Sequence, residues 1–532
     1  MKRRGFLRGS AAALALVPGG VALTEPALTE TALTNSEAVI AAARALANAP
    51  YLPRPQALPP PFDALSYDSH RAIRPIEGRA ARLPLGHEFR ADLLPPGWLF
   101  PDPVTITFAG ERPAPVFGTG LFEFDPRYFP QPPTARAMPE AGFSGLRLLY
   151  PLNAADRLDE LIVFQGASYF RALARDAVYG LSARALALGT GGAEPEEFPI
   201  TRQIAVLDTE PGRVTLGCVI DSPRAACALI AAITPGRAGA PETVMDCALH
   251  LFTRETITNA GIAPLTSMFQ HSDMGPAGID DFRPAVHDSD VLVIDNGAGE
   301  RLWRPLANPA TLQMSAFEDD APRRFGLVQT ADHFDRFRDG EAAYHRRPSA
   351  MVEPAGDWGA GAVMLLEIPT IDEFADNIAV FWRPDAPLEP GQEHRFAYRL
   401  RWQPAGLQPL PAADPPLALM PVRHATGIEP GLRGARRFVI DYAPPQGSSP
   451  PAPDKLALII TAAERATISG QTLHRLAGTP DTLRASFLLT PDATMDHAEL
   501  RVDLRHRDGT QTTGAAAPVW IWRWGRALDG GP

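Results

Sequence analysis

VMDCALHLFT, residues 244–253, is a short and mainly apolar run, and segments of this kind decide the fold class. Similar runs recur between residues 62 and 403: VTITFAG (104–110), LRLLYPL (146–152), RVTLGCVI (213–220) and HRFAYRLRW (394–402). Turn residues separate them, and few windows show the apolar spacing of a long helix. This pattern predicts short antiparallel strands, and hence a mainly β protein built as a sandwich or barrel.

Composition excludes several functional classes. The chain has 532 residues, of which 45% are hydrophobic and 21% charged, as is ordinary for a globular protein of two or three domains. A net charge of −11 argues against a nucleic-acid partner, because no basic surface is available to neutralise phosphates. No window reaches about 18 uninterrupted apolar residues, so we expect no stable membrane span.

The N-terminus is typical of an export signal. Residues 1–23 begin with Lys2, Arg3 and Arg4 and continue into the apolar run AAALALVPGGVAL. RRGFLRG, residues 3–9, is close to the twin-arginine pattern, although an ordinary secretory signal remains the alternative. We expect the protein to leave the cytoplasm.

The rest of the chain divides at proline-rich stretches. Residues 24–60 are expected to form a linker with one helical segment, Ser36 to Leu46, and residues 61–402 a large β-sandwich domain. Residues 403–421 hold six prolines and predict a second linker. Five strand-like runs follow within 422–532, which suits a small immunoglobulin-like sandwich.

Two further segments need interpretation. SYFRALARDAVYGLSARALAL, residues 168–188, has a periodicity compatible with a helix, which Gly180 and Ser182 weaken. The three cysteines, Cys218, Cys227 and Cys247, are odd in number and give no disulfide framework. We interpret them as buried small apolar residues.

Carboxylates accompany aromatic residues in three segments. FRPAVHDSDVLVIDNGAGERLWRPLANP (282–309) and VEPAGDWGAGAVMLLEIPTIDEFADNIAVFW (352–382) are the two long ones, and FQGASYFR (164–171) is the third. Glycoside hydrolysis needs two carboxylates across a cleft, one as acid and one as base or nucleophile. Aromatic rings offer flat apolar faces to sugars, and polar side chains supply hydrogen bonds.

Two alternatives apply to the same residues. Any single aspartate here is more often a solvated turn residue. His287, Asp288 and Asp290 also include metal-ligand types, but on a strand only Asp288 and Asp290 would share a face. We therefore expect no metal and no other cofactor.

Several of these segments together resemble the periplasmic glucan biosynthesis family, OpgG/OpgD (also called MdoG/MdoD). The resemblance is carried by the segment 282–309, by RRFGLVQTADHFDRF, by RPSAMVEPAGDWGAGAVMLLEIPT, by DNIAVFWRP, by FQGASYFRALARDAVYGLSARALAL and by EEFP. It covers nearly all of the chain after the signal, and the twin-arginine-type signal makes the chain look OpgD-like.

The resemblance implies a large N-terminal β-sandwich of the galactose-mutarotase-like type and a C-terminal immunoglobulin-like β-sandwich. It also implies a periplasmic role in making osmoregulated glucans with a β-1,2-linked backbone. Members are inverting endo-β-1,2-glucanases or related transglycosylases, whose catalytic carboxylates match Asp288 and Asp376 here. We assign Asp376 as the acid and Asp288 as the base.

Within the matching segments we expect further side chains to bind the sugar: His287, Asp290, Trp303, Arg304, Asp357, Trp358, Tyr169 and Arg171. On this interpretation, segment 282–309 lines a glucan cleft rather than a sheet core. The partner would be β-1,2-glucan polysaccharide, and a homodimer is possible. A non-catalytic protein that binds and guides nascent glucan is the alternative, and the sequence does not separate hydrolysis from transglycosylation.

Overall fold

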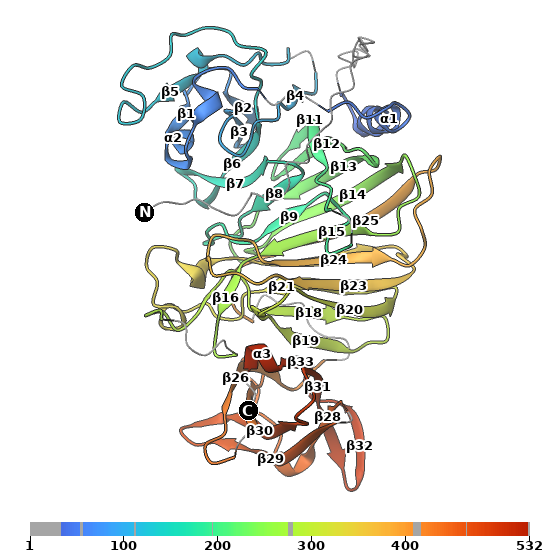
Figure 1. Cartoon of the computed structure of the whole chain (residues 1–532). Coiled ribbons are helices and arrows are strands. Elements are labelled where there is room, and N and C mark those ends of the chain that lie inside the picture. The colour runs from blue at the N-terminus through green and yellow to red at the C-terminus, as the bar shows by residue number, and fades with distance from the viewer. Residues whose placement is uncertain are drawn as a thin grey trace.

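The structure, a computed structural model, describes residues 33–53, 57–110, 113–193, 195–274, 280–407, 416–432, 434–463 and 465–529 (Figure 1). The expected signal segment 1–23 lies outside the described residues. Helices are few: α1 (Ser36–Ala47), α2 (Tyr67–Arg71), α3 (Arg526–Asp529) and the short 3-10 turns η1 (Phe62–Ala64), η2 (Thr119–Leu121), η3 (Phe334–Arg336), η4 (Tyr344–Arg346) and η5 (Pro453–Lys455). Of the helices in these ranges, none is long and apolar enough to cross a membrane.

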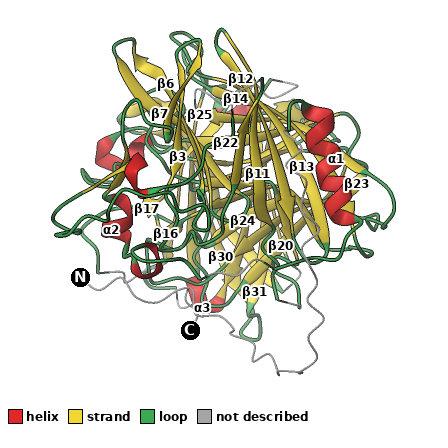
Figure 2. Ribbon diagram, turned by 90° about the horizontal axis from the view of Figure 1, so that it is seen from above, coloured by secondary structure: helices red, strands yellow, loops and turns green. Residues whose placement is uncertain are grey.

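Helix α1 confirms the helix expected at Ser36 to Leu46. The side chain of Asn35 accepts a hydrogen bond from the backbone of Ala38 at 2.9 Å and caps the first turn. Val39 and Ala43 are buried against the outer face of the neighbouring sheet. Figure 2 shows the helix lying along one side of the strands, and this amphipathic packing explains its stability.

One large sheet contains eleven strands, ordered β2-β3-β6-β7-β8-β9-β15-β24-β23-β20, with β10 paired to β15. Its pairings are antiparallel. The strands are β2 (Arg82–Gly86), β3 (Phe89–Leu94), β6 (Gly145–Ala154), β7 (Arg157–Gln165), β8 (Tyr169–Ala172), β9 (Ser182–Arg184), β10 (Leu186–Leu188), β15 (Ala260–Ser267), β20 (Gln313–Asp320), β23 (Ala360–Glu367) and β24 (Ile378–Pro384).

The second large sheet contains fourteen strands, ordered β28-β31-β33-β19-β18-β21-β22-β25-β14-β13-β12-β11-β4, with β32 paired to β31. The strands are β4 (Thr105–Phe108), β11 (Ile200–Glu210), β12 (Arg213–Asp221), β13 (Ala225–Thr234), β14 (Thr243–Thr253), β18 (Val291–Asp295), β19 (Arg301–Pro305), β21 (Arg324–Val328), β22 (Ser349–Ala355), β25 (His394–Gln403), β28 (Leu456–Ala462), β31 (His497–Asp508), β32 (Gln511–Ala515) and β33 (Val519–Gly525). Residues 244–253 lie in β14, as expected.

A continuous hydrophobic core contains side chains of both large sheets. From β14 it takes Met245, Cys247, Leu249 and Leu251, which alternate along the strand as a half-buried strand requires. All three cysteines are buried and unpaired on β12, β13 and β14, which confirms their interpretation as small apolar residues. The prediction of a mainly β chain with antiparallel sheets is confirmed.

The C-terminal part places a four-stranded sheet against one end of the fourteen-stranded sheet, and a second core cluster contains side chains of both. All five runs expected to be strands there are strands. One surprise is that β33 pairs in parallel with β19, matching Leu302 with Val519 and Trp303 with Trp520. The remaining strands are β26 (Met420–Ile428), β27 (Arg436–Ala443), β29 (Ala466–Leu476) and β30 (Thr479–Pro491), and two small sheets consist of β1 (Ile73–Pro75) with β5 (Phe122–Phe124) and β16 (Phe269–His271) with β17 (Val286–His287).

Residues 168–188 do not form a helix. They contain strands β8, β9 and β10, which pair with β7 and β15. Tertiary pairing therefore overrides the local periodicity, because neighbouring strands on both sides supply the backbone hydrogen bonds.

Candidate functional site

Asp288 follows β17 directly and lies in a bend before β18. Its backbone N–H donates to the carbonyl of Met268 at 2.8 Å, and its side chain is almost fully buried, with 4% of the residue exposed. Nη1 of Arg347 donates a hydrogen bond to Oδ1 of Asp288. The carboxyl is thus fixed at the end of a short strand and faces a guanidinium.

The surroundings of Asp288 raise the pKa of its carboxyl to about 6. Burial is the largest cause, since it disfavours the charged form; the charge of Arg347 opposes it, and the charge of Asp376 adds to it. The effect of Asp376 means that the two predicted carboxylates are within electrostatic reach of each other. A carboxyl with this pKa is largely ionised at neutral pH and can take up a proton in mildly acidic solution.

Asp376 lies near the end of the loop between β23 and β24, and its side chain is about one-third exposed, at 33%. Its Oδ2 accepts a hydrogen bond from Oγ1 of Thr266 at 3.4 Å and lies 3.8 Å from Nη2 of Arg171. The partial exposure makes Asp376 the more accessible of the two carboxylates.

Asn377 fixes the loop that carries Asp376 relative to Asp288. Its side-chain amide donates to the carbonyls of Phe269 and Ile368, both at 3.0 Å, and accepts from the N–H of Phe269 at 2.8 Å. Phe269 in turn pairs with His287, the residue before Asp288. The small sheet of β16 and β17 therefore connects the two backbone segments that carry Asp288 and Asp376.

Tyr169 and Arg171 lie on one face of β8, because residues two apart in a strand share a face. The turn before β8 contains Gly166 and Ala167, both with positive φ (78° and 43°), and a Cβ at Gly166 would lie 2.9 Å from the ring of Phe100. Nε of Arg171 donates to Oγ of Ser182 on β9 at 2.5 Å. The structure thus brings Arg171 close to Asp376, another of the residues expected at the site.

A second ion-pair cluster holds the nearby loops together. Arg283 bonds three carboxylates: Asp281 and Glu373 at 2.7 Å each and Asp339 at 2.9 Å. The hydroxyl of Tyr344 also donates to Glu373, at 3.1 Å. Arg347, the partner of Asp288, lies over the ring of Tyr344 at 4.3 Å.

His287 and Asp290 do not join Asp288 at an accessible site. His287 has no exposed surface and stacks on Phe269, with its ring centroid 5.6 Å away. Burial, the largest cause, holds its pKa well below the ordinary value, so the ring is neutral. Asp290 is buried and accepts from the N–H and hydroxyl of Thr330, at 2.9 and 2.6 Å. The expectation that Asp288 and Asp290 share a strand face does not hold, because the chain bends between β17 and β18.

Trp303 and Arg304 lie inside a sheet, contrary to the expectation that segment 282–309 forms a cleft wall. Strands β18 and β19 are buried along their whole length, because alternate side chains pack into the main core on one face of the sheet and into the C-terminal core cluster on the other. Trp303 packs in the C-terminal core cluster, and Arg304 forms a buried ion pair with Glu367 at 2.9 Å. These two side chains contribute packing and charge neutralisation.

Asp357 and Trp358 lie in a turn between β22 and β23. The carboxylate of Asp357 accepts the backbone N–H of Gly359 at 2.8 Å, as an Asx turn does. Trp358 is buried in the main core and donates to the carbonyl of Ala397 at 3.1 Å. Among the described residues, neither one forms a hydrogen bond or ion pair with the two predicted catalytic carboxylates.

Sequence reasoning missed Arg347, Thr266 and Asn377 as members of the site. The only sequence signal for Arg347 was the segment that carries it, because the burial of Asp288, which calls for a cationic or hydrogen-bonding partner, is seen only in the structure. Arg347 begins the segment RPSAMVEPAGDWG that the sequence had already singled out, and Asn377 lies in DNI. Thr266 carried no such signal, since only the register of β15 places it there.

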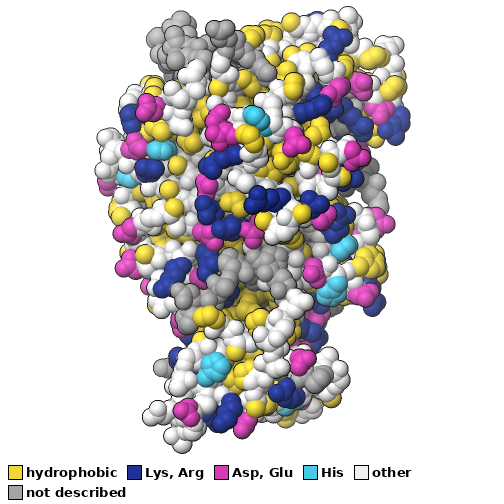
Figure 3. All heavy atoms as spheres, turned by 180° about the vertical axis from the view of Figure 1, so that it is seen from behind, with side chains coloured by type: hydrophobic (Ala, Val, Ile, Leu, Met, Phe, Trp, Pro, Cys, Tyr) yellow, Lys and Arg dark blue, Asp and Glu magenta, His cyan; other side chains and the backbone are white. Residues whose placement is uncertain are grey.

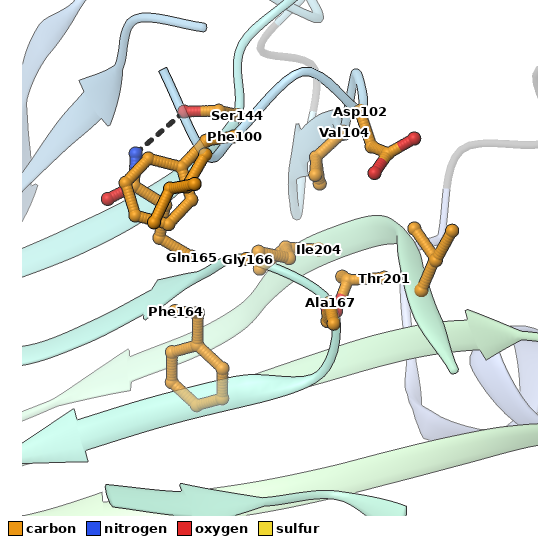
Figure 4. A pocket seen from close by; sticks show the side chains of 12 residues that line it. Phe100, Asp102, Val104, Ser144, Phe164, Gln165, Gly166, Ala167, Thr201 and Ile204 are labelled. Carbon is orange, nitrogen blue, oxygen red and sulfur yellow. Dashed lines mark hydrogen bonds between the residues drawn. The ribbon is translucent and has the colours of Figure 1, made fainter. Parts of the chain in front are cut away.

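A separate small pocket lies near the turn that precedes β8 (Figure 4). Figure 4 shows Phe100 and Gln165 on one side and Thr201 on the other, with the amide of Gln165 donating to Ser144 at 2.8 Å. Its cavity of about 20 Å³ holds about one water molecule and no sugar ring. The described residues contain no group of acids, histidines and cysteines arranged for a metal ion.

Figure 3 shows the surface on the side opposite to the view of Figure 1. Basic and acidic side chains alternate over this face. On this face, the described residues therefore carry charges of both signs.

Comparison with known proteins connects this geometry to a family. The family model described as periplasmic glucan biosynthesis protein, MdoG, matches residues 35–524. The glucans biosynthesis protein G of Shewanella frigidimarina is 39% identical over 508 residues, covering 94% of this chain and 86% of the relative. The protein of the same name from Vibrio cholerae serotype O1 is 40% identical over 508 residues, covering 93% and 87%. The glucans biosynthesis protein G 1 of Shewanella oneidensis is 37% identical over 508 residues, covering 94% and 89%.

These relatives are named G and not D, so their names do not support the OpgD-like assignment made from the signal segment. Family membership itself does not depend on that segment, because the match begins after it, at residue 35. The chain belongs to the MdoG family of periplasmic glucan biosynthesis proteins and has its role in the making of periplasmic glucans.

Proposed function

We propose that the protein acts on the β-1,2-linked glucan backbone as an inverting endo-β-1,2-glucanase or a related transglycosylase. The observation that carries this proposal is the pair of carboxylates in unlike environments. Asp288 is buried against Arg347 with a pKa of about 6, and Asp376 is partly exposed beside Arg171 and close enough to influence it. Carboxyls with different environments suit divided acid and base roles. The acid role goes to Asp376 because it is the more exposed of the two, so a glycosidic oxygen can reach it directly.

In the proposed reaction, Asp376 donates its proton to the glycosidic oxygen, and the bond between that oxygen and the anomeric carbon breaks. Ionised Asp288 accepts a proton from the attacking water as the water oxygen bonds to the anomeric carbon from the opposite face, which inverts its configuration. Because Asp288 is buried, we infer that this proton reaches it through a second water or a substrate hydroxyl. In a transglycosylase, a sugar hydroxyl takes the place of the attacking water.

Arg347 and Arg171 support these roles as positioning residues. The positive charge of Arg347 lowers the pKa of Asp288 against the effect of burial, which favours its ionised form at neutral pH. Arg171 lies between Ser182 of β9 and Asp376, and its exposed part can hydrogen-bond sugar hydroxyls.

We also propose the domain division expected from the sequence. Residues 61–402 would form a catalytic β-sandwich of the galactose-mutarotase-like type, and residues 422–532 an immunoglobulin-like domain. Support comes from the two separate core clusters, one of which lies mainly among the C-terminal strands. Residues 1–23 would be the twin-arginine-type signal that delivers the chain to the periplasm.

Product analysis tests the proposal. Linear β-1,2-glucan is incubated with the purified protein, and the products are separated by thin-layer chromatography. We expect shorter linear glucans from a hydrolase and rings from a transglycosylase. If the glucan binds to the protein but is not cleaved, the enzyme proposal fails. The alternative, a protein that binds and guides glucan, would then take its place.

A further inference from the structure

Phe198 is an exposed aromatic residue that the proposed reaction leaves without a role. It belongs to EEFP, residues 196–199, and 46% of its surface is exposed. The segment is held in place before β11: the carboxylate of Glu196 accepts from Thr190 at 2.6 Å, and the backbone N–H of Glu197 donates to Leu188 at 2.9 Å. The ring is therefore presented to solvent from a fixed backbone.

The guanidinium of Arg184 packs against the ring of Phe198. Its guanidinium carbon lies 4.9 Å from the ring centroid of Phe198 and 5.1 Å from that of Tyr169. Nη1 of Arg184 donates to Glu196 at 2.6 Å, whereas Nε and Nη2 are buried and have no hydrogen-bond partner among the described residues. The residue is only 3% exposed. Its contacts with the two rings thus supply the packing that compensates an otherwise costly burial.

The register of the strands places this aromatic cluster on the same sheet face as the proposed site. Tyr169 on β8 is opposite Arg184 on β9, and Arg171 bonds to Ser182, two residues before Arg184. Ser182 is opposite Thr266 on β15, whose hydroxyl contacts Asp376. The pair formed by Tyr169 and Arg184 and the pair formed by Arg171 and Ser182 are two residues apart, which corresponds to roughly 7 Å along the strands.

Electrostatics agree with this proximity. The pKa of Tyr169 is raised, chiefly by burial, and the charges of Asp376 and Glu196 contribute to the rise. The charges of the proposed acid, Asp376, and of Glu196 in the EEFP segment therefore both influence Tyr169. A continuous path leads from Asp376 past Arg171 and Tyr169 to Phe198.

We propose that Phe198, supported by Arg184, which also lies over Tyr169, is a remote sugar-binding platform on which one glucose ring of a bound β-1,2-glucan stacks. The flat aromatic face suits the C–H surface of a pyranose, and the chain then runs over β9 and β8 to the two carboxylates. The platform gives the protein a preference for long glucan chains, because short ones do not reach it. This inference rests on the proposed function in that the ligand is taken to be β-1,2-glucan.

The test measures binding in the Asp376→Asn background, so that glucan is not consumed during the titration. Isothermal titration calorimetry with linear β-1,2-glucan should give about tenfold weaker binding for the added substitution Phe198→Ala, the scale of one aromatic contact. Phe198→Trp should keep the affinity of the parent. The control is Tyr128→Ala, since Tyr128 is similarly exposed, at 43%, and also has a guanidinium over its ring, that of Arg127 at 5.9 Å.

Chain length supplies the second arm. A short β-1,2-linked oligosaccharide that fills only the positions next to the carboxylates should bind the parent and the Phe198→Ala variant equally. Parent-like affinity of Phe198→Ala for long glucan would overturn the platform, as would equal weakening for short and long chains or failure of the parent to bind β-1,2-glucan. If Phe198→Ala weakens long-chain binding but the native protein cleaves nothing, the platform stands and only the catalytic proposal falls.

Discussion

Replacing Asp288 with Asn should change how the stability of the protein depends on pH. The folded state raises the pKa of this carboxyl from the ordinary value of 3.8 to about 6. The folded protein therefore binds a proton more tightly than the unfolded chain does. Its contribution to stability is fully present below pH 3.8 and is lost as the pH rises through about 6.

The magnitude follows from the two pKa values. They differ by a little over two pH units, which corresponds to about 3 kcal/mol of unfolding free energy, since one unit is worth about 1.4 kcal/mol. Asp288 is almost fully buried, so solvent screening does not reduce this value substantially. The Asn variant has no titrating group at this position, so it does not lose this unfolding free energy as the pH rises.

Urea unfolding of both proteins from pH 4 to pH 7.5 measures the effect. The difference in unfolding free energy between native protein and Asp288→Asn should move by about 2 kcal/mol in favour of the variant as the pH rises, mostly below pH 6.5. Using the difference cancels the other titrating groups, which both proteins share. A constant difference, or one that moves in favour of the native protein, would refute the reasoning, because the influence of Arg347 would then outweigh burial.

Three further predictions follow from the site and the chain organisation. Substituting Arg347→Gln removes the charge that lowers the pKa of Asp288, so the acidic limb of the activity profile should move above pH 6; an unmoved limb in a pH–rate series would count against this role. Limited proteolysis should cut first within the proline-rich residues 403–421, and the two fragments should stay together on a sizing column because β33 pairs with β19; first cuts inside 61–402 would argue against two domains. Changing Arg3 and Arg4 together to Lys should keep the precursor in the cytoplasm, as cell fractionation would show. Normal export of this variant would indicate an ordinary secretory signal instead of a twin-arginine signal.

The sheets were largely predictable because burial imposes a visible period on the sequence. Residues 244–253 place alternate side chains in the main core, and the five C-terminal runs are all strands. The helix at Ser36 was also visible, since Asn35 caps an apolar stripe. Residues 168–188 form strands although their periodicity is compatible with a helix. The cause is that β7 and β15 supply pairing partners, which the local sequence does not reveal.

The site was predictable only in part. Asp288 and Asp376 come from segments almost 90 residues apart, and the family resemblance rather than any local pattern connected them. Trp303 was misjudged because its segment contains charges, yet side chains from the far end of the chain, brought there by the pairing of β33 with β19, pack against it in the C-terminal core cluster. The sequence does not show which strand will lie beside another when they are more than 200 residues apart.

Turnover of linear β-1,2-glucan by Asp376→Asn tests the central claim most directly. An amide is nearly the size of a carboxyl but cannot donate the proton of an acid, so we expect turnover to fall at least about 10²-fold. The melting temperature should hardly change, because the side chain is partly exposed and, in the part of the chain that the structure describes, its hydrogen bonds and ion pairs are only those with Thr266 and Arg171. Full activity of this variant on the same glucan would remove Asp376 from the mechanism and contradict the account.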